Sequence, residues 1–181
     1  MVAGFDHPDP DPEEIFSIVS SFMPGVLITG VVVAIIHFCW FYSLGNFLHK
    51  KLPSAVTMPV RTFRAFVIIP ALYSIIASVL AFYFVQYVFS VIPHHIHNAH
   101  YFDDNGIPAF FFIPLLLIPV HLFMAFCMFY TFYFVAKCFK AVEKQRGVTT
   151  GDYIGEFFLM WFSFVGVWLI QPKINRLAAE E

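Results

Sequence analysis

Charged residues are scarce in this chain. Only 12% of its 181 residues are charged, whereas soluble domains carry about 25%. The net charge of −2 leaves no broad basic surface, so binding to nucleic acid is not expected. Hydrophobic residues make up 60% of the chain and include 25 Phe, a composition that suits helices facing lipid.

Cysteine is scarce too, and the common catalytic motifs are absent. The chain has 3 Cys, an odd number, and Cys39 and Cys127 lie inside apolar runs, so no disulfide framework is predicted. The acidic N-terminus is the opposite of the basic start of a cleavable signal peptide. A nucleophile elbow, a P-loop and an HExxH zinc motif are all missing, which favours a non-enzymatic protein.

What is present is a long apolar run from Pro108 to Ala136, followed by Lys137 and Lys140. Its polar side chains are limited to His, Thr and Tyr, and none carries a permanent charge. About 20 apolar residues span a bilayer core, and soluble proteins rarely use a helix this long that is apolar on every face. The run therefore predicts a transmembrane helix.

The remaining apolar segments extend this prediction to an all-α polytopic membrane protein, with four transmembrane helices in a bundle and one domain over residues 1–181. The four spans are expected at about 24–48, 65–92, 108–136 and 153–170. Residues 1–11 are expected to form a flexible acidic N-terminus. A short helix from Pro12 to Phe22 is expected to be interrupted at Pro24, and Pro93 is expected to end the second span.

The basic residues predict the orientation. Loops 50–64 and 137–151 each hold four Lys or Arg, whereas the N-terminal tail and loop 93–107 hold none. The positive-inside rule places both basic loops in the cytoplasm. A fourth span carries the C-terminus outside, where Lys173 and Arg176 contradict the rule, and a re-entrant fourth segment removes that conflict.

The second predicted span carries small residues at three- and four-residue spacing, so that they share one helix face. These residues are Ser74, Ala77, Ser78 and Ala81. Small residues let membrane helices approach closely, so this face is predicted to be the inner packing surface of the bundle.

A His-rich loop follows the second span. His94, His97 and His100 lie near one face of a helical turn, with Asp103 and Asp104 close by in sequence. Neutral imidazoles with a carboxylate suit a divalent transition metal such as Zn²⁺, Cu²⁺ or Ni²⁺. The alternatives are a polar loop at headgroup level and a pH sensor that charges below about pH 6.5.

Two further histidines, His37 and His121, lie inside predicted spans. Counted from the external ends, both lie near the bilayer midplane on parallel helices, where they could ligate a haem axially or pass a proton. The alternative is a neutral His that is hydrogen-bonded to a neighbouring helix. In the fourth segment, Asp152 and Glu156 share one helix face at the level of Lys137 and Lys140, which predicts a salt-bridge cluster at the helix end. The alternative is a proton or cation site.

The C-terminal stretch resembles a known group of sequences. Residues 155–162 read GEFFLMWF and residues 166–175 read GVWLIQPKIN, and residues 134–146 fit the same pattern. This pattern is similar to a group of small multi-helix bacterial membrane proteins that have no assigned activity. The resemblance implies the bacterial inner membrane as the location and transfers no site residues.

Together these features predict an integral membrane protein that is a non-enzymatic accessory or assembly subunit. Such a subunit packs in the lipid bilayer against a larger membrane partner, within a membrane protein complex or a homo-oligomer. The alternative is a small carrier, or a haem- or metal-binding redox protein that uses the intramembrane and loop histidines. Polar groups gathered on one inner face would favour the carrier.

Overall fold

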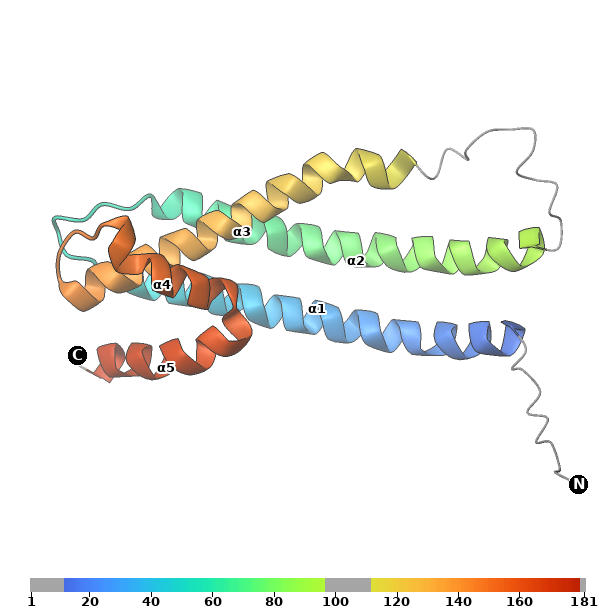
Figure 1. The fold of residues 1–181 in the computed structure, drawn as a ribbon, viewed down its shortest axis with the longest axis horizontal. Helices are drawn as coiled ribbons and strands as arrows, with labels where there is room; N and C mark the ends of the chain where they lie inside the picture. The colour runs from blue at the N-terminus through green and yellow to red at the C-terminus, as the bar shows by residue number, and fades with distance from the viewer. Residues whose placement is uncertain (1–11, 97–111, 180–181) are drawn as a thin grey trace, which may run out of the picture.

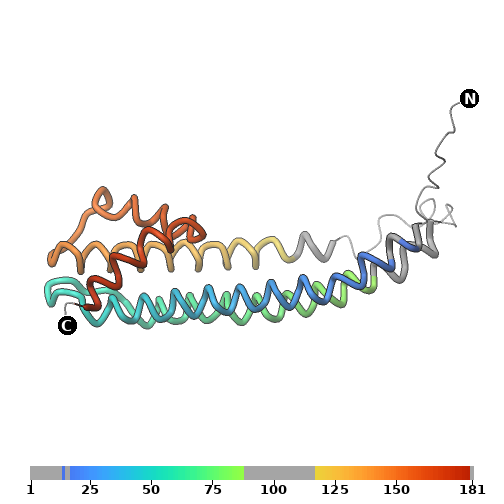
Figure 2. The backbone as a smooth tube through the Cα atoms, turned by 90° about the horizontal axis from the view of Figure 1, so that it is seen from below, coloured from blue at the N-terminus to red at the C-terminus, as the bar shows by residue number. Residues whose placement is uncertain are grey.

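The computed structural model describes the backbone of residues 12–96 and 112–179, and every element in these ranges is an α-helix. The helices are α1 (Pro12–Lys50), α2 (Val60–Ile96), α3 (Phe112–Lys144), α4 (Thr150–Trp161) and α5 (Ser163–Ala179). The long helices α1, α2 and α3 run alternately up and down (Figure 1). Figure 2 shows α1 and α2 side by side in one layer, with α3 above this layer and α4 above α3. α5 runs from the level of α4 back toward the level of α1.

Three helices, α1, α2 and α3, are long and apolar enough to cross a membrane in the described part of the chain. The all-helical, membrane-like character predicted from the sequence is therefore confirmed. The count of four spans is not confirmed, because residues 153–170 do not form one helix: α4 ends at Trp161 and α5 begins at Ser163.

Two predicted helix ends are wrong, because α1 passes through Pro24 and α2 continues past Pro93 to Ile96. A proline inside a helix removes one backbone hydrogen bond and favours a bend. Long helical runs on both sides hold the chain in register despite that loss, and α1 bends toward its N-terminal end (Figure 2). Pro119 lies inside α3 in the same way.

The α4–α5 pair folds back on itself. α4 packs against α3 and α5 packs against α4, and α5 returns toward the end of the molecule at which α4 begins (Figure 1). The reversal depends on Gly166, because a Cβ there would overlap the carbonyl oxygen of Leu159. The amide of Gly166 donates to the carbonyl of Phe162 at 2.8 Å, which begins α5 directly after the break.

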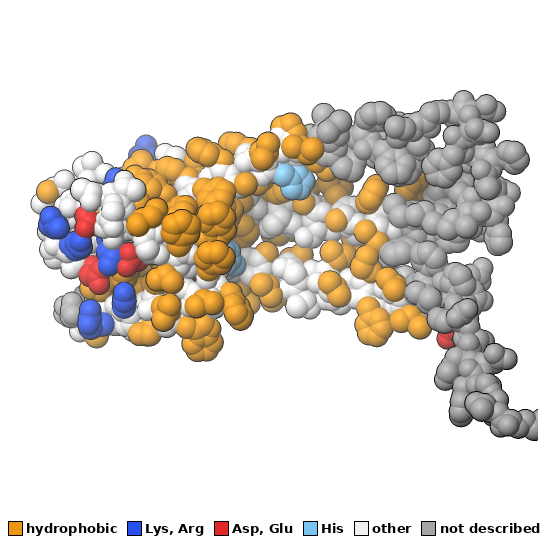
Figure 3. Space-filling model, in the orientation of Figure 1, with side chains coloured by type: hydrophobic (Ala, Val, Ile, Leu, Met, Phe, Trp, Pro, Cys, Tyr) orange, Lys and Arg blue, Asp and Glu red, His pale blue; other side chains and the backbone are white. Residues whose placement is uncertain are grey.

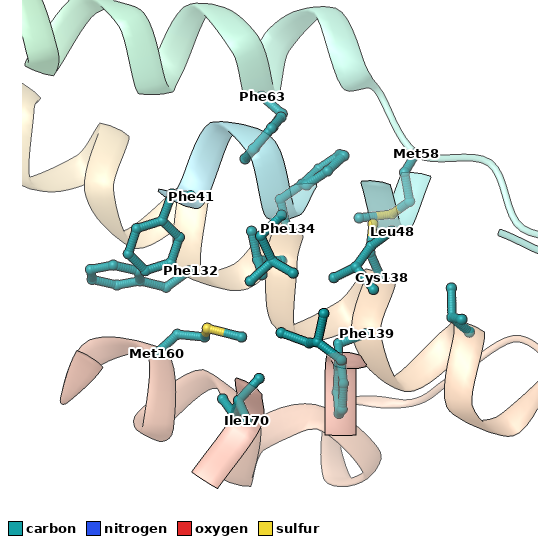
Figure 4. Packing of buried hydrophobic residues seen from close by; sticks show 14 of the residues in the cluster. Phe41, Leu48, Met58, Phe63, Phe132, Phe134, Cys138, Phe139, Met160 and Ile170 are labelled. Atoms are coloured by element: carbon teal, nitrogen blue, oxygen red, sulfur yellow. The ribbon is translucent and has the colours of Figure 1, made fainter. Parts of the chain in front are cut away.

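The core occupies one half of the molecule, formed by residues 38–70 and 127–179, which we call the basic half. Every buried residue of the described chain lies in this half. All five helices contribute to the cluster (Figure 4). The remaining described residues, 12–37, 71–96 and 112–126, form the distal half.

A close contact in the core joins α1, α2 and α3. The ring of Phe63 lies directly on the backbone of Gly45, where a Cβ would overlap the ring. Phe134 also packs on Phe63, and the two rings stack with their centroids 4.3 Å apart. Phe63 and Phe134 are fully buried, so Gly45 sets the separation of α1 and α2.

The charges follow the same division. All 10 Lys and Arg residues of the chain lie in the basic half, and Figure 3 shows the Lys and Arg side chains of this face gathered at one end. These residues are Lys50, Lys51, Arg61, Arg64, Lys137, Lys140, Lys144, Arg146, Lys173 and Arg176. Because α5 returns to this end, Lys173 and Arg176 lie with the other cations rather than opposite them.

Candidate functional site

The metal site predicted in the His-rich loop falls almost wholly outside the described residues. His97, His100, Asp103 and Asp104 are not described, and the side chain of His94 is not described either, although its backbone belongs to α2. Among the side chains that the structure describes, which are those of Glu14 and of residues 17–87 and 117–179, no three His, Cys, Asp or Glu gather closely enough to hold a metal ion. The loop site stays a prediction.

His37 lies on α1 and packs among aromatic rings. Its imidazole meets the ring of Phe41 edge-on, with centroids 4.8 Å apart, and also meets Phe38 edge-on at 6.0 Å. Phe41 in turn contacts Phe132 of α3 at 5.3 Å, which fixes the register of the two helices.

His121 lies on α3 and bonds to α2. One ring nitrogen, Nδ1, is 2.8 Å from the carbonyl of Leu117, and the other, Nε2, is 3.1 Å from the hydroxyl of Tyr73. A neutral imidazole satisfies both contacts, with Nδ1–H donating to Leu117 and Tyr73 donating to Nε2. This is the geometry of a neutral His that is hydrogen-bonded to a neighbouring helix.

The two intramembrane histidines differ in depth. His37 lies four residues before Phe41, and His121 lies eleven residues before the Phe132 that contacts Phe41. A difference of seven residues corresponds to about 10 Å along a helix. Their contacts also involve different groups, so the geometry does not favour a haem held between them.

The polar pair of Tyr73 and His121 lies on an otherwise apolar surface of the distal half. His121 is exposed and Tyr73 is half-buried. Their neighbours on the same two helices include the exposed apolar residues Leu72, Ile76 and Leu122. Tyr73 lies nine residues, or about 14 Å, beyond Arg64 along α2, a distance close to half the thickness of a bilayer core of about 30 Å.

An ion-pair cluster joins α3 to α4 in the basic half. Lys140 contacts Glu143 at 2.6 Å and the buried Glu156 at 2.7 Å, and Lys144 pairs with Asp152. The salt-bridge cluster predicted at this helix end is therefore present, with Glu156 paired to Lys140. Lys137 was assigned to this cluster by the sequence, but its ammonium lies instead 3.0 Å from the hydroxyl of Tyr133.

The side chain of Asp152 also makes hydrogen bonds at the start of α4. Its carboxylate accepts hydrogen bonds from the backbone amide of Thr149 at 2.9 Å and from the Thr149 hydroxyl at 3.0 Å. The hydrogen bond from Lys144, followed by these two bonds from Thr149, holds the pKa of Asp152 well below its usual range. The arrangement fits a structural ion pair at a helix start.

A second junction, between α1 and α5, could not be found from the sequence. The indole N–H of Trp40 donates to the side-chain carbonyl of Gln171 at 3.1 Å, and Lys51 donates to the carbonyl of Leu177 at 2.6 Å. Trp40 and Gln171 are separated by 131 residues, and no local pattern links them. These bonds hold the returning helix against the end of α1.

Comparison of the chain with protein-family models, curated proteins and solved structures finds no match. The resemblance of the C-terminal stretch to bacterial membrane proteins therefore stays a prediction. Three described features bear on function: the Tyr73–His121 pair, the α4–α5 hairpin and the distribution of charge.

Proposed function

We propose that this chain is a three-span protein of the bacterial inner membrane and that it acts as a non-enzymatic accessory or assembly subunit of a larger membrane complex. In this proposal the basic half lies at the cytoplasmic face and the distal half crosses toward the external face. The α4–α5 hairpin enters the membrane from the cytoplasmic side and returns.

The orientation is supported by the separation of charge. All 10 Lys and Arg residues lie in the basic half, and the positive-inside rule assigns that half to the cytoplasmic side. A returning α5 places Lys173 and Arg176 on that side too. The conflict that four spans create with the rule then disappears.

The re-entrant hairpin is supported by length and by its aromatic tip. α4 has 12 residues, about 18 Å, which is too short for a bilayer core of about 30 Å. The α4–α5 turn exposes large apolar side chains, with Phe164 88% exposed. The exposed aromatic residues around this turn are Phe158, Trp161, Phe162, Phe164 and Trp168. At the tip of a hairpin that enters the membrane, large apolar side chains meet the hydrocarbon core, where their exposure carries no penalty.

The observation that carries the subunit role is the exposed Tyr73–His121 pair. Ionisable residues inside a membrane almost always face the interior of a bundle rather than lipid. In the single chain His121 is exposed, so the pair becomes interior only when another helix covers it. A covering partner also explains why none of the residues in the most apolar stretch of α1 is buried in its own chain.

The small-residue stripe of α2 supports the same reading. Ser74, Ala77 and Ser78 are half-buried and Ala81 is exposed, so the stripe is only partly used within the chain. The hydroxyl groups of Ser74 and Ser78 donate to carbonyls of their own helix, at 2.8 and 2.7 Å. The stripe therefore offers a smooth surface of low polarity for close helix approach.

Topology is tested by single-cysteine labelling in a variant whose three native Cys are replaced by Ala. We expect Gly147→Cys and Ala179→Cys to be protected from an impermeant thiol reagent in intact cells, and Asn105→Cys to be labelled. Gly147 has open space around it, so the substitution is tolerated. Labelling of Ala179→Cys from outside, with Gly147→Cys protected, would restore four spans and contradict the proposal.

The subunit role is tested by photocrosslinking from α3 in native membranes. A crosslinking amino acid at Ala125, one turn from His121 on the same face, is expected to capture a larger membrane protein. The matched control is Phe123, which is also exposed but lies on the opposite face. A product of twice the mass of this chain would assign the face to a second copy instead. Absence of a product from Ala125, or equal products from both positions, would contradict a specific partner on this face.

A further inference from the structure

The two halves of the described chain contain different numbers of helices. The distal half contains parts of three helices, α1, α2 and α3, whereas the basic half contains parts of these three and the whole of α4 and α5. Figure 2 shows α4 and α5 at the basic end, while the three long helices continue toward the other end. The described part of the chain is therefore wider in one half than in the other.

The α4–α5 turn ends within one leaflet. Near the end of α4, the ring of Trp161 meets the ring of Phe129 edge-on, with centroids 4.8 Å apart. Phe129 lies eight residues, or about 12 Å, from Lys137, the first cation at the basic end of α3. Half of a bilayer core is about 15 Å thick. A hairpin that enters the membrane beside α3 therefore ends before the middle of the bilayer.

Both ends of the hairpin are fixed at the basic end of the long helices. At the start of α4, Asp152 pairs with Lys144 of α3. Near the end of α5, the carbonyl of Leu177 accepts a hydrogen bond at 2.6 Å from Lys51, which directly follows α1. The turn between these ends exposes Phe164 to 88%, so its side chain faces lipid rather than the rest of the chain. The hairpin therefore adds two helices to the leaflet of the basic half and none to the opposite leaflet.

The two extra helices make the protein asymmetric across the bilayer. A helix with its side chains is about 10–12 Å across, so each helix fills about 100 Å² in the plane of the membrane. α4 and α5 together displace about 200 Å² of lipid from one leaflet. A protein that is wider in one leaflet fits best where that leaflet is convex, because bending spreads the lipids of the convex side apart. Helices that insert into a single leaflet are sensitive to curvature.

From this difference in width we infer that the chain concentrates in curved bilayer, with its basic half in the convex leaflet. In the orientation proposed above, this is membrane that bulges into the cytoplasm. The inference rests on the three spans and the re-entrant hairpin of the proposed function, and it adds a preferred shape of the surrounding lipid. It does not depend on the partner expected at the Tyr73–His121 pair.

The test is the sorting of the purified full-length protein among vesicles of different diameter. A dye at Gly147→Cys, in the variant whose three native Cys are replaced by Ala, marks the basic end. The protein is reconstituted without a partner into phosphatidylcholine vesicles that carry a lipid dye, and the number of molecules per lipid area is measured in single vesicles. An impermeant quencher then removes the signal of molecules whose basic end points outward, which separates the two orientations in one sample.

The two orientations are matched controls for each other. For molecules with the basic half in the outer leaflet, we expect the density to rise about twofold or more from the largest to the smallest vesicles. For molecules in the opposite orientation, we expect the density to fall over the same range. A density that does not depend on diameter, or that changes in the same direction for both orientations, would overturn the inference, because the shape predicts opposite signs.

A second measurement checks the depth of the hairpin. In a Trp40→Phe/Trp168→Phe background, Trp161 is the remaining one of the 3 Trp. Lipids brominated near the ends of their acyl chains are expected to quench it more than lipids brominated near the headgroup. Equal or reversed quenching would place the hairpin at the surface and overturn the asymmetry. Deep quenching without sorting would overturn the curvature preference alone. Labelling at Ala179→Cys reports the topology separately, so the two failures are distinguishable.

Discussion

The basic half and the distal half are built from the same long helices, but they differ in how many of their side chains are buried within the chain. In the basic half, side chains from five helices bury one another, and Phe63 lies on the bare backbone of Gly45. In the distal half no described residue is buried, although its residues are as apolar. Leu72 and Leu122, for example, are 57% and 66% exposed.

This difference shows which part of the fold the chain determines by itself. In lipid, apolar side chains gain little by leaving the solvent, so helices associate through close packing and hydrogen bonds. The basic half has both: glycine contacts at Gly45 and Gly166, and ion pairs from Lys140 and Lys144. The distal half has the Tyr73–His121 hydrogen bond between helices, and the small-residue face of α2 is only partly covered by the rest of the chain.

The largest expected effect comes from Gly166→Ala. The new Cβ would overlap a backbone carbonyl, which cannot move without opening the α4–α5 turn. We expect a loss at or above the upper end of the usual range for overpacking, about 1–3 kcal/mol, measured as thermal unfolding in detergent. Gly155→Ala in α4 meets open space and is the control. Equal stability of the two variants would show that the turn is not closed as described.

The next prediction compares the two halves on one helix. Gly45→Ala pushes a Cβ against the buried Phe63 ring, which is stacked on Phe134 and cannot swing away. We expect it to destabilise by about 1–3 kcal/mol. Gly30→Ala lies in the distal half of α1 with nothing near it, and is expected to be neutral or stabilising by up to about 1 kcal/mol. Reversal of this order in thermal unfolding would remove the distinction between the halves.

A smaller effect is expected from Glu156→Gln. The amide keeps the shape of the side chain but removes the charge that Lys140 contacts from α4, while Glu143 continues to pair with Lys140. We expect a cost of about 1.5 kcal/mol, the lower end of what hydrogen bonds to charged groups contribute, because Glu143 still pairs with Lys140. Glu14→Gln, on the exposed start of α1 in the distal half, is expected to change nothing. An equal effect from both would assign the cost to net charge alone.

The sequence was sufficient for the features that depend on composition. Long apolar runs predicted α1, α2 and α3, and the acids near the start of α4 predicted an ion-pair cluster with the lysines at the end of α3. It was not sufficient for the break at Phe162, because residues 153–170 are apolar on both sides of the break. α4 and α5 meet through a close backbone contact between Gly166 and Leu159, and composition alone does not predict such a contact.

The site could be predicted only in part for a related reason. His121 stood out as a polar residue in an apolar run, but its partner Tyr73 lies on another helix, 48 residues away. The pairing of His37 with His121 was a guess about depth, and depth depends on how α1 and α3 cross. The contact of Phe41 with Phe132, which fixes that crossing, follows from three-dimensional packing rather than from spacing.

The smallest expected effect concerns Asp152 and the pH dependence of the basic half. The native pKa of Asp152 lies below its value in the unfolded chain, chiefly because Lys144 donates to it, and Thr149 adds to the effect. A lowered native pKa means that the unfolded state takes up the proton first as the pH falls. The stabilisation is therefore fully present above about pH 4 and is lost progressively below it.

Asp152→Asn should flatten this acid-side loss while lowering stability slightly at pH 7, and Glu14→Gln in the distal half should leave the profile unchanged. The effect at pH 7 should shrink further in 1 M salt, because the pair is accessible to solvent and the screening length falls to about 3 Å. The measurement is the thermal midpoint in detergent from pH 7 down to the lowest pH at which the protein stays dispersed. A profile that is the same for the parent and for Asp152→Asn would place Lys144 and Asp152 apart in solution, and would leave the start of α4 held by packing alone.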